Sequence, residues 1–474
     1  QDMRGFSLNP READPSQLTN NPEQLAPAGP GVQAVARPSA QEAAMPKPSA
    51  CVLTNGARLY VDHAHPEYSS PETLGPMQGA LYDVAGDLIA RRAMELAAEN
   101  GNQIELYKNN VDGKGAAYGS HENYLLRRDL DFYGLAQNLI PFLVTRPLIC
   151  GAGRVGIGQR SEKPGFQISQ RADYVENDIG LETTFNRPII NTRDEPHANP
   201  SRWRRLHVIG GDANRFQYST YLRLGATAAL LWLLENPDCP QVKQLKELRI
   251  TSDPVEETWA VSHDISLTHR VETVSGPLSA LQIQNAIRAA IAEALEERGG
   301  ADEASAALLG DWQQVLDSLA TDRELAARWV EWVGKYRLLE RMRQRLGCDW
   351  NHPKIQALDL QWAALRPGIF ENICDAGMVE QLFSPEEVLR AVQQPPCGGR
   401  SWVRGMAVAK LPQVKKGSWQ SLLLDLGGEQ LLRFSLGDPD CAASPAEMRA
   451  LENGDAAAFA RALSAKKEKP IEKF

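Results

Sequence analysis

A hairpin signal around residue 55 constrains the fold of this 474-residue chain more than any other feature. Residues 52–54 and 57–62 have the composition of two strands, and Asn55-Gly56 lies between them. Asn and Gly both tolerate positive φ, so this dipeptide predicts a type I′ turn that joins two antiparallel strands. The sequence therefore predicts that ordered structure starts near Cys51 with an antiparallel hairpin.

Strand and helix patterns alternate along the rest of the chain. Apolar residues at alternating or helical spacing distinguish the two kinds of element. Helices are expected at 76–100, within 130–143, and at 218–235, 279–298, 309–319, 323–346, 354–364 and 444–464. Strands are expected at 104–109, 166–174, 178–184, 189–193, 205–209 and 259–263, with a second hairpin formed by 418–426 and 430–434. No internal repeat is evident in this order.

Composition divides the chain into three parts. Residues 1–50 are rich in proline and lack periodicity, so this leader is expected to be mobile. Residues 51–395 form the expected main domain, and the Pro- and Gly-rich stretch 395–399 is typical of a hinge. Residues 396–474 are expected to form a small C-terminal domain.

Composition and charge exclude several classes of protein. The chain has 51 Lys and Arg against 60 Asp and Glu, a net charge of −9, which argues against sequence-blind binding to nucleic acid. The longest apolar stretch, 226–234, is about half of what a membrane-spanning helix needs, and no apolar signal segment follows residues 1–4. The seven cysteines never form a CxxC pair, so neither a disulfide framework nor a cysteine zinc site is expected. A reduced, cytoplasmic protein without membrane or nucleic-acid partners is the expectation.

One face of the strand 57–62 carries unusual side chains. Because side chains alternate along a strand, Arg58, Tyr60 and Asp62 share one face, opposite the apolar face. A half-solvated edge strand would show the same alternation. The following run, His63-Ala64-His65-Pro66-Glu67, adds two imidazoles and a carboxylate close to Asp62. Oxygen ligands with an occasional imidazole suit Mg²⁺ bound to a nucleotide. A zinc site is less well supported, because the sequence has no third or fourth zinc ligand at a recognised spacing.

Other regions add groups that bind anions. Residues 107–124 combine three glycines with His121-Glu122-Asn123, so the backbone can approach a phosphate closely, although a solvated turn is the alternative. Cations recur on later strands, around Arg171, Arg193 and 204–207, and several together would suit a polyphosphate. The GxGxxG match at 151–156 is rejected as a dinucleotide site, because no helical pattern follows it.

Long motifs at 60–68, 108–124, 153–158 and 191–198 together resemble the Pup ligase/depupylase family. The resemblance extends from about Cys51 into the C-terminal domain. Within the family, the spacer His63-Ala64 and the serine before His-Glu-Asn, Ser120, favour the depupylase branch over the ligase branch. The Pro-rich leader likewise resembles a mobile loop of the depupylase branch.

The resemblance implies a fold and a reaction. The family is similar to glutamine synthetase, so the expected fold is α+β, with a curved, mostly antiparallel sheet as a cradle, flanking helices and a small C-terminal domain. ATP and Mg²⁺ are expected in the cradle. The expected reactions are deamidation of the C-terminal Gln of Pup and cleavage of the isopeptide bond in pupylated proteins. Because Pup is disordered and acidic, Arg202, Arg204 and Arg205 are candidates for a basic docking groove.

Motif positions imply roles for individual residues. Asp62 is expected to be the catalytic carboxylate, as general base or nucleophile. The other expected site residues are Mg²⁺ ligands (Tyr60 and Glu67), ligands of a second metal or of the phosphates (His121 and His207), and nucleotide contacts (Arg58, Ser70, Arg171, Arg193 and Trp419). Arg400 and Arg404 have two open interpretations, contacts to phosphate or a brace at the domain junction.

One departure from the family pattern concerns the metal site. The family opens with a strand of the type Gly-Thr-Glu-x-Glu-Tyr whose glutamates hold Mg²⁺, and this sequence, which begins at Gln1, contains no such segment. The expectation is therefore either a fragment or a chain with incomplete metal binding. Three hypotheses result: an ATP-dependent hydrolase of Pup amide bonds, a Pup–protein ligase, and a truncated module that binds Pup or nucleotide without catalysis.

Overall fold

The computed structural model describes residues 32–39, 50–62, 65–112 and 114–465. It divides the chain into two compact units, which are described separately. Unit 1 takes its described residues from 1–89, 195–204 and 384–474, and unit 2 takes them from 90–194 and 205–383. The chain passes between the units four times: within α3 (Pro76–Glu99), within β10 (Trp203–Gly211), and at residues 194/195 and 383/384. Each unit is thus assembled from segments that are far apart in the sequence.

Unit 1 contains two sheets. One has the strand order β2-β3-β4 and consists of β2 (Ala50–Val52), β3 (Arg58–Asp62) and β4 (His65–Ser69). The other has the order β1-β15-β14-β13 and consists of β1 (Val32–Val35), β13 (Val414–Gly417), β14 (Ser421–Leu424) and β15 (Leu431–Ser435). Besides the first part of α3, the helices are α15 (Pro385–Gln393), α16 (Arg400–Lys410), α17 (Pro445–Glu452) and α18 (Ala456–Ser464).

β1 lies within the leader that the sequence predicts to be mobile. It pairs in antiparallel register with β15, from Val32 opposite Phe434 to Val35 opposite Leu431. Four residues are too few to show a period, so the sequence contains no signal for this strand. The rest of the leader, apart from 36–39 and Ala50, lies outside the described residues.

The hairpin between β2 and β3 confirms the predicted antiparallel pairing, but its turn is not of type I′. The N–H of Leu53 donates to Ala57 O (2.8 Å) and the N–H of Gly56 donates to Leu53 O (3.0 Å), so the loop has three residues. Gly56 has a φ of 81°, whereas Asn55 does not share a positive φ. Asn55 accepts the N–H of Ala57 on its side-chain oxygen instead (3.1 Å). The loop is therefore a turn closed by one left-handed glycine, the usual form for this length.

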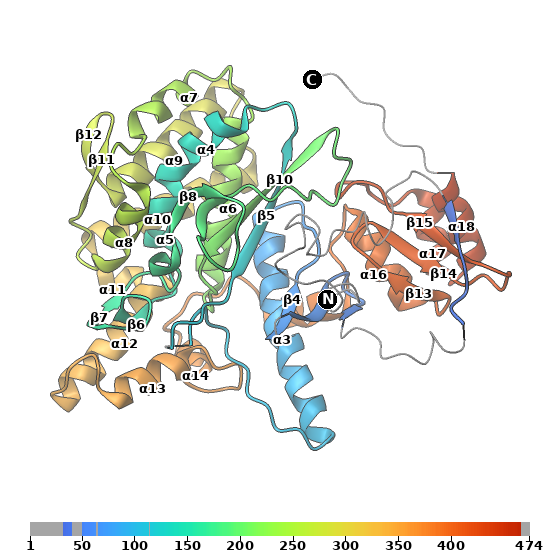
Figure 1. Ribbon diagram of the computed structural model, residues 1–474, viewed down its shortest axis with the longest axis horizontal. Helices are drawn as coiled ribbons and strands as arrows, with labels where there is room; N and C mark the ends of the chain where they lie inside the picture. Colours follow the sequence, from blue (N-terminus) through green and yellow to red (C-terminus); the bar gives the residue numbers. More distant parts are fainter. Residues whose placement is uncertain (1–31, 40–49, 63–64, 113, 466–474) are drawn as a thin grey trace. The chain divides into compact units, whose positions relative to one another are not determined.

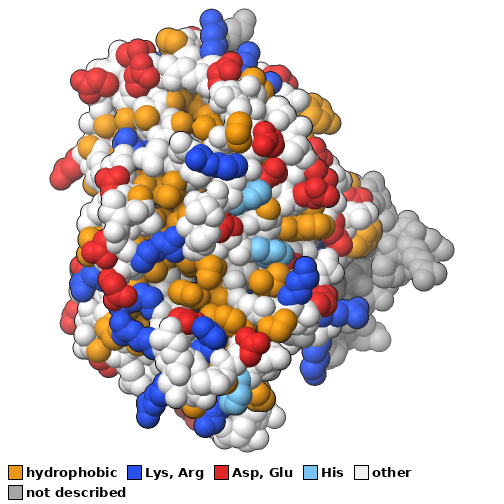
Figure 2. Space-filling view, turned by 90° about the vertical axis from the view of Figure 1, so that its left-hand side faces the viewer, with side chains coloured by type: hydrophobic (Ala, Val, Ile, Leu, Met, Phe, Trp, Pro, Cys, Tyr) orange, Lys and Arg blue, Asp and Glu red, His pale blue; other side chains and the backbone are white. Residues whose placement is uncertain are grey.

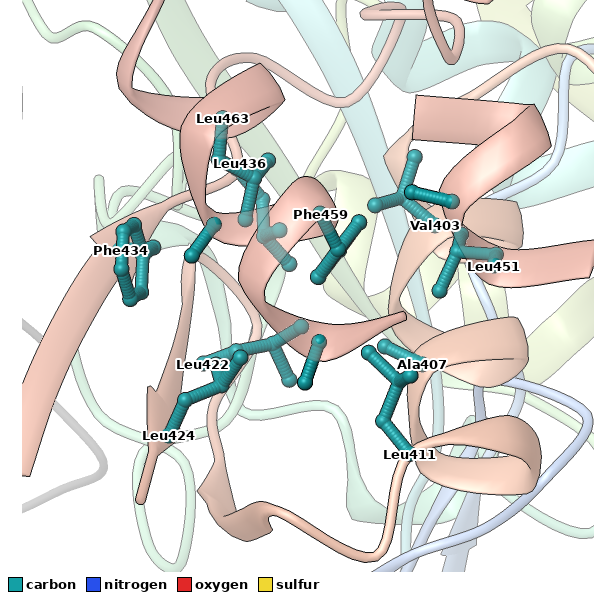
Figure 3. Packing of buried hydrophobic residues seen from close by; sticks show 13 residues of the cluster. Val403, Ala407, Leu411, Leu422, Leu424, Phe434, Leu436, Leu451, Phe459 and Leu463 are labelled. Atoms are coloured by element: carbon teal, nitrogen blue, oxygen red, sulfur yellow. The ribbon is translucent and has the colours of Figure 1, made fainter. Parts of the chain in front are cut away.

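The C-terminal part of unit 1 has its own hydrophobic core. α16, α17 and α18 pack with the sheet of β13, β14 and β15 (Figure 1). The buried side chains at the centre of this core include Val403, Leu422, Phe434, Leu451 and Phe459 (Figure 3). The hairpin of β14 and β15 confirms the hairpin that the sequence predicts at 418–434.

Unit 2 combines one larger sheet with two hairpins. The sheet has the order β5-β10-β9-β8 and consists of β5 (Ser120–Arg127), β8 (Asn177–Gly180), β9 (Pro188–Asn191) and β10. β9 is antiparallel to β10 and parallel to β8. The hairpins are β6 (Arg154–Ile157) with β7 (Lys163–Gln167), and β11 (Arg270–Thr273) with β12 (Gly276–Ser279). β6 begins within the GxGxxG segment 151–156 and continues past its end, so no helix begins there, as predicted.

Helices make up most of unit 2. They are α4 (Phe132–Thr145), α5 (Pro147–Cys150), η3 (Ala172–Tyr174), α6 (Gln217–Leu234), α7 (Gln241–Gln244), η4 (Leu245–Leu248), α8 (Pro254–His263), α9 (Ala280–Glu297), α10 (Glu303–Thr321), α11 (Arg323–Ala326), α12 (Glu331–Leu346), α13 (Pro353–Trp362) and α14 (Ile369–Asp375). α4, α6, α9 and α10 pack against one another (Figure 1), with Trp312 fully buried edge-to-face against Phe142. The α+β fold with mostly antiparallel sheets flanked by helices is confirmed.

Several elements differ from their predictions. Residues 259–263 are the end of α8 and not a strand, because Asp253 caps that helix and Pro254 occupies its first turn. Residues 104–109 contain only an isolated bridge at Tyr107. The predicted helix 323–346 is interrupted between α11 and α12. The predicted helix 444–464 is interrupted between α17 and α18, where Gly454 takes a φ of 66°.

The helices and one face of the surface can be compared with the composition. Within the described residues, no helix combines the length and the apolar character that crossing a bilayer requires. On the face of the molecule in Figure 2, hydrophobic side chains lie interspersed with side chains of both charges.

Candidate functional site

In unit 1, the β3–β4 hairpin places the predicted catalytic residue on a polar face. Arg58, Tyr60 and Asp62 occupy alternate positions of β3, so their side chains share a face. Across the antiparallel ladder, Tyr60 lies opposite Glu67 and Asp62 lies opposite His65. Directly opposed residues share a face as well, so this face gathers a guanidinium, a phenol, an imidazole and two carboxylates. The predicted strand and the shared face are confirmed, but Val61, on the face expected to pack in the core, is 41% exposed.

The phenol of Tyr60 is held in its neutral form. Its hydroxyl lies 3.2 Å from the hydroxyl of Ser69. Burial first, and then the negative charge of Glu67, raise the pKa of Tyr60 above its usual range. The hydroxyl close to Tyr60 therefore belongs to Ser69. Ser70, the predicted nucleotide contact, follows β4 and is exposed.

Trp419, from the loop before β14, lies among cationic side chains of unit 1. The guanidinium carbon of Arg58 is 5.7 Å from the centre of the Trp419 ring and 5.8 Å from that of Tyr60. The Nε atom of Arg58 is buried and has no hydrogen-bond partner among the described residues. An unmatched buried donor beside an aromatic face suits an anionic ligand that carries an aromatic base.

Arg400 and Arg404 form a brace within unit 1. Of the two interpretations, this arrangement favours a brace over contacts to phosphate. Arg404 donates to Gly56 O (2.9 Å) and to Trp419 O (3.0 Å), and its guanidinium carbon lies 4.8 Å from the Trp419 ring centre. Both arginines pair with Glu72. Burial opposes ionisation of Glu72, but the charges of Arg404 and Arg400 outweigh it and lower its pKa to about 2. All three guanidinium nitrogens of Arg404, and Nε and Nη1 of Arg400, thus donate to the protein itself.

In unit 2, β5 separates the residues of the His-Glu-Asn motif onto two faces. His121 and Asn123 are on the exposed face, and Glu122 is buried on the other. Glu122 accepts two hydrogen bonds from Arg146, at 2.8 and 2.9 Å, and a third from the hydroxyl of Tyr124. The carboxylate of Glu122 is therefore engaged in a buried ion pair, and only the two flanking side chains of the motif face outward.

His207 of β10 lies against His121 of β5. Their ring centres are 5.0 Å apart, and the planes are close to perpendicular. Nδ1 of His207 lies 2.8 Å from the side-chain oxygen of Asn123, which also accepts from Arg205 (3.3 Å). Because that oxygen only accepts, Nδ1 of His207 donates, and Nε2 retains a lone pair. Burial, followed by the charges of Arg205, His121 and Arg193, lowers the pKa of His207 well below its usual range.

Arg171 is a buried arginine with two unmatched nitrogen atoms. One nitrogen donates weakly to Ile209 O (3.4 Å), while Nε and Nη1 have no partner among the described residues. Burial and the nearby charge of Arg187 lower the pKa of Arg171 to about 10. Burying a cation without partners is costly, so this position is suited to a bound anion.

Asp212, directly after β10, holds the loop that carries Arg171. Its carboxylate accepts from the backbone N–H groups of Ala152 (2.8 Å), Gln170 (2.9 Å) and Arg171 (3.2 Å) and from the hydroxyl of Ser169 (2.8 Å). Sequence reasoning missed this residue, because an aspartate after a strand is common in loops. The only signal was its place after the predicted strand 205–209.

The donor sets of each unit fit the groups that the resemblance implies. Unmatched guanidinium donors in both units match phosphate oxygens, and the Tyr60–Glu67 pair offers oxygen atoms that suit Mg²⁺. Within the described part of the chain, no cluster of three or more His, Cys, Asp or Glu side chains has metal-binding geometry. His63 and Ala64, the spacer that the sequence analysis used, lie outside the described residues.

Comparison with known proteins identifies related chains. The model of a family described as Pup-ligase protein matches residues 1–423. A Pup deamidase/depupylase from Mycobacterium tuberculosis (strain CDC 1551 / Oshkosh) is 43% identical over 398 residues, covering 82% of this chain and 77% of the relative. A depupylase from Acidothermus cellulolyticus is 42% identical, covering 91% and 82%. A Pup–protein ligase from Acidimicrobium ferrooxidans is 41% identical, covering 74% and 78%.

Solved structures are similar as well. The Pup ligase PafA in complex with ADP has a TM-score of 0.75 at 32% identity, covering 86% of this chain and 91% of that chain. PafA in complex with the prokaryotic ubiquitin-like protein Pup has a TM-score of 0.75 at 30% identity, covering 90% and 91%. The fold and the related chains define an enzyme that acts on amide or isopeptide bonds. More specifically, the chain belongs to the Pup ligase family.

Proposed function

We propose that this enzyme deamidates the C-terminal glutamine of Pup to glutamate and cleaves the isopeptide bond between Pup and lysines of pupylated proteins. The observation that carries this proposal is the similarity to relatives named as depupylases, at 42–43% identity over up to 91% of the chain. The relative named as a ligase is similar over 74% of the chain. Ser120, which precedes His121-Glu122-Asn123, also agrees with the depupylase branch.

Asp62 is the proposed general base or nucleophile. Hydrolysis of an amide requires such a group, together with a way to stabilise the oxyanion. The carboxylate of Asp62 is half-buried on the face of β3 that also carries Arg58 and Tyr60. A strand holds its side chains in fixed positions, so it can orient a catalytic group more precisely than a mobile loop can.

ATP and Mg²⁺ are the proposed cofactors. Tyr60 and Glu67 would hold Mg²⁺, which as a Lewis acid polarises a carbonyl or phosphoryl oxygen when it is bound. The remaining proposed ligands are His121 and His207 for a second metal or the phosphates, and Arg58, Ser70, Arg171, Arg193 and Trp419 for the nucleotide. The unmatched donors of Arg58 and Arg171 support this assignment.

Pup and pupylated proteins are the proposed partners. Of the arginines proposed for an acidic partner, Arg202 pairs with Asp438 (3.2 Å) and lies over the ring of Trp203. Arg205 donates to Asn123. Both are anchored by the protein, so they would present charge to a disordered partner in a fixed position, which reduces the ordering cost of docking.

Two substrates test the proposal. Incubated with ATP, Mg²⁺ and Pup ending in Gln, the enzyme should release ammonia and convert the terminal Gln to Glu, as mass spectrometry of Pup would show. Incubated with a pupylated protein, it should release free Pup on a gel. Binding of Pup with neither product would contradict hydrolysis and would support the non-catalytic module.

A Pup–protein ligase is the second candidate. It is favoured by the two solved structures, both of a Pup ligase, at 30–32% identity. The decisive mixture contains the enzyme, ATP, Pup ending in Glu and a lysine-containing target protein. Formation of a conjugate, with consumption of one ATP for each bond, would favour ligation over hydrolysis.

A further inference from the structure

Trp419 has an aromatic neighbour in unit 1 that the candidate site described above does not include. The ring centres of His197 and Trp419 are 6.5 Å apart, and the two planes are tilted by 34°. His197 comes from the segment 195–204 and Trp419 from the loop between β13 and β14, and both belong to unit 1. His197 also lies in the motif 191–198, which contains the proposed nucleotide contact Arg193.

The backbone of His197 is held in a conformation that few residues adopt. Its φ is 48°, in the left-handed region, which a residue other than glycine enters at a cost in free energy. Such a conformation persists only where the surrounding structure enforces it, and residues of this kind gather at active sites and ligand clamps. The half-buried side chain of His197 is therefore a candidate for contact with a ligand.

Two contacts within unit 1 enforce this conformation. Arg400, which is buried and paired with a carboxylate, donates to the carbonyl oxygen of His197. Two residues further on, the N–H of Asn199 donates to the carboxylate of Asp438 (2.7 Å). The brace that contains Arg400 thus fixes the turn that brings the imidazole beside Trp419.

The spacing of the His197 and Trp419 rings suits a planar base. Aromatic side chains that pair directly have ring centres roughly 4.5–7 Å apart, so this pair lies at the wide end of the range. A base stacked between two rings requires about 7 Å, twice the roughly 3.4 Å spacing of stacked bases. A small movement of either side chain would therefore admit a base.

We propose that His197 stacks on the base of a bound purine nucleotide, on the side opposite Trp419, and favours purines over pyrimidines. This inference rests on the proposed function, because it requires that ATP binds beside Trp419. The phosphates would lie towards Arg58, whose guanidinium carbon is 5.7 Å from the Trp419 ring centre. Different side chains would thus contact the base and the phosphates, so the two contributions to binding can be measured separately.

Calorimetric titration of the full chain with ATP and with inorganic tripolyphosphate, each with Mg²⁺, tests the proposal. His197→Gly removes the ring and suits the left-handed backbone. We expect this variant to bind ATP about tenfold more weakly, as for the loss of one stack between a base and an aromatic ring, and to bind tripolyphosphate as the wild type does. Its preference for ATP over CTP should shrink, because a pyrimidine has less surface to stack. His197→Phe, which retains a planar ring, should keep most of the affinity for ATP.

A matched control makes the same kind of exchange at another left-handed residue. Asn186 has a φ of 46° and is exposed in the loop between β8 and β9, so Asn186→Gly should leave the affinity for ATP unchanged. The proposal is overturned if the wild-type chain does not bind ATP, or if His197→Gly binds ATP with wild-type affinity. It is also overturned if His197→Gly loses as much affinity for tripolyphosphate as for ATP, or keeps the wild-type preference for ATP over CTP. None of these measurements involves Pup, so a failure to hydrolyse Pup conjugates would contradict the proposed function alone.

Discussion

At the scale of single residues, arginines with buried nitrogen atoms differ in what those atoms contact. Arg146, Arg400 and Arg404 are paired with carboxylates inside their own unit. Arg58 and Arg171 instead have buried nitrogen atoms without partners among the described residues. A protein retains an unpaired buried charge at a cost in stability, and such groups gather at functional positions. An unmatched nitrogen does not by itself mark a ligand contact, because Arg154 and Arg223, which lie within ion-pair distance of carboxylates, carry one as well.

Replacing Arg171 tests its proposed role as a nucleotide contact. We expect Arg171→Met to weaken nucleotide binding about tenfold or more, because unmatched donors for phosphate are lost. The free energy of unfolding should stay the same or rise, because an apolar side chain of similar length removes an unpaired buried charge. Calorimetric titration with ATP and chemical denaturation measure the two quantities. Loss of stability with normal nucleotide binding would show that Arg171 is structural.

Glu72 makes unit 1 sensitive to acid. Its pKa is lowered from 4.5 to about 2 in the folded chain. The stability that it contributes is therefore complete above pH 4.5 and is lost as the pH falls from 4.5 towards 2. Glu72→Gln should cost on the order of 2–3 kcal/mol at pH 7, with the difference from wild type shrinking across this window.

Denaturation at a series of pH values measures this difference. Glu429→Gln is a suitable control, since Glu429 is exposed in the loop between β14 and β15 and has no ion pair among the described residues. That control should follow the wild-type curve. A gap between wild type and Glu72→Gln that is the same at all pH values would contradict the assigned ion pairs.

At the scale of elements, the β2–β3 turn packs tightly on α16. A Cβ atom on Gly405 would lie 2.5 Å from Thr54 O and 2.8 Å from Gly56 N, and backbone atoms cannot move aside cheaply. Gly405→Ala should therefore destabilise the chain by roughly 2–4 kcal/mol. In contrast, Gly310→Ala in the exposed middle of α10 meets nothing within 4 Å and should stabilise it by about 0.5–1 kcal/mol. Thermal unfolding compares the two, and equal effects would refute the close approach.

Elements with a long, clear period were predictable from the sequence. The helix expected at 218–235 is α6 (Gln217–Leu234), and the face of β3 with Arg58 and Tyr60 follows from alternation alone. β1 was not predictable, because its partner strand is about four hundred residues away. Asp212 and Glu72 were missed for the same reason, since their importance arises from contacts that only the tertiary structure creates.

At the scale of the whole molecule, the overall charge says little about the sites. The chain has a net charge of −9, yet Arg193 and Arg205 contribute to the positive surroundings of His207. An acidic protein can therefore bind anions where local cations outnumber carboxylates. The roles proposed for ATP, Mg²⁺ and Pup depend on the family, whereas the positions of the residues in each unit follow from the fold.

The most direct test of the account replaces Asp62 by Asn and measures release of Pup from a purified conjugate. The account predicts that Asp62→Asn lowers the rate of release by roughly a hundredfold or more, because the general base or nucleophile is lost. Calorimetric titration should show that ATP still binds with wild-type affinity. Release at the wild-type rate by Asp62→Asn would contradict the central claim that the carboxylate on β3 performs the hydrolysis.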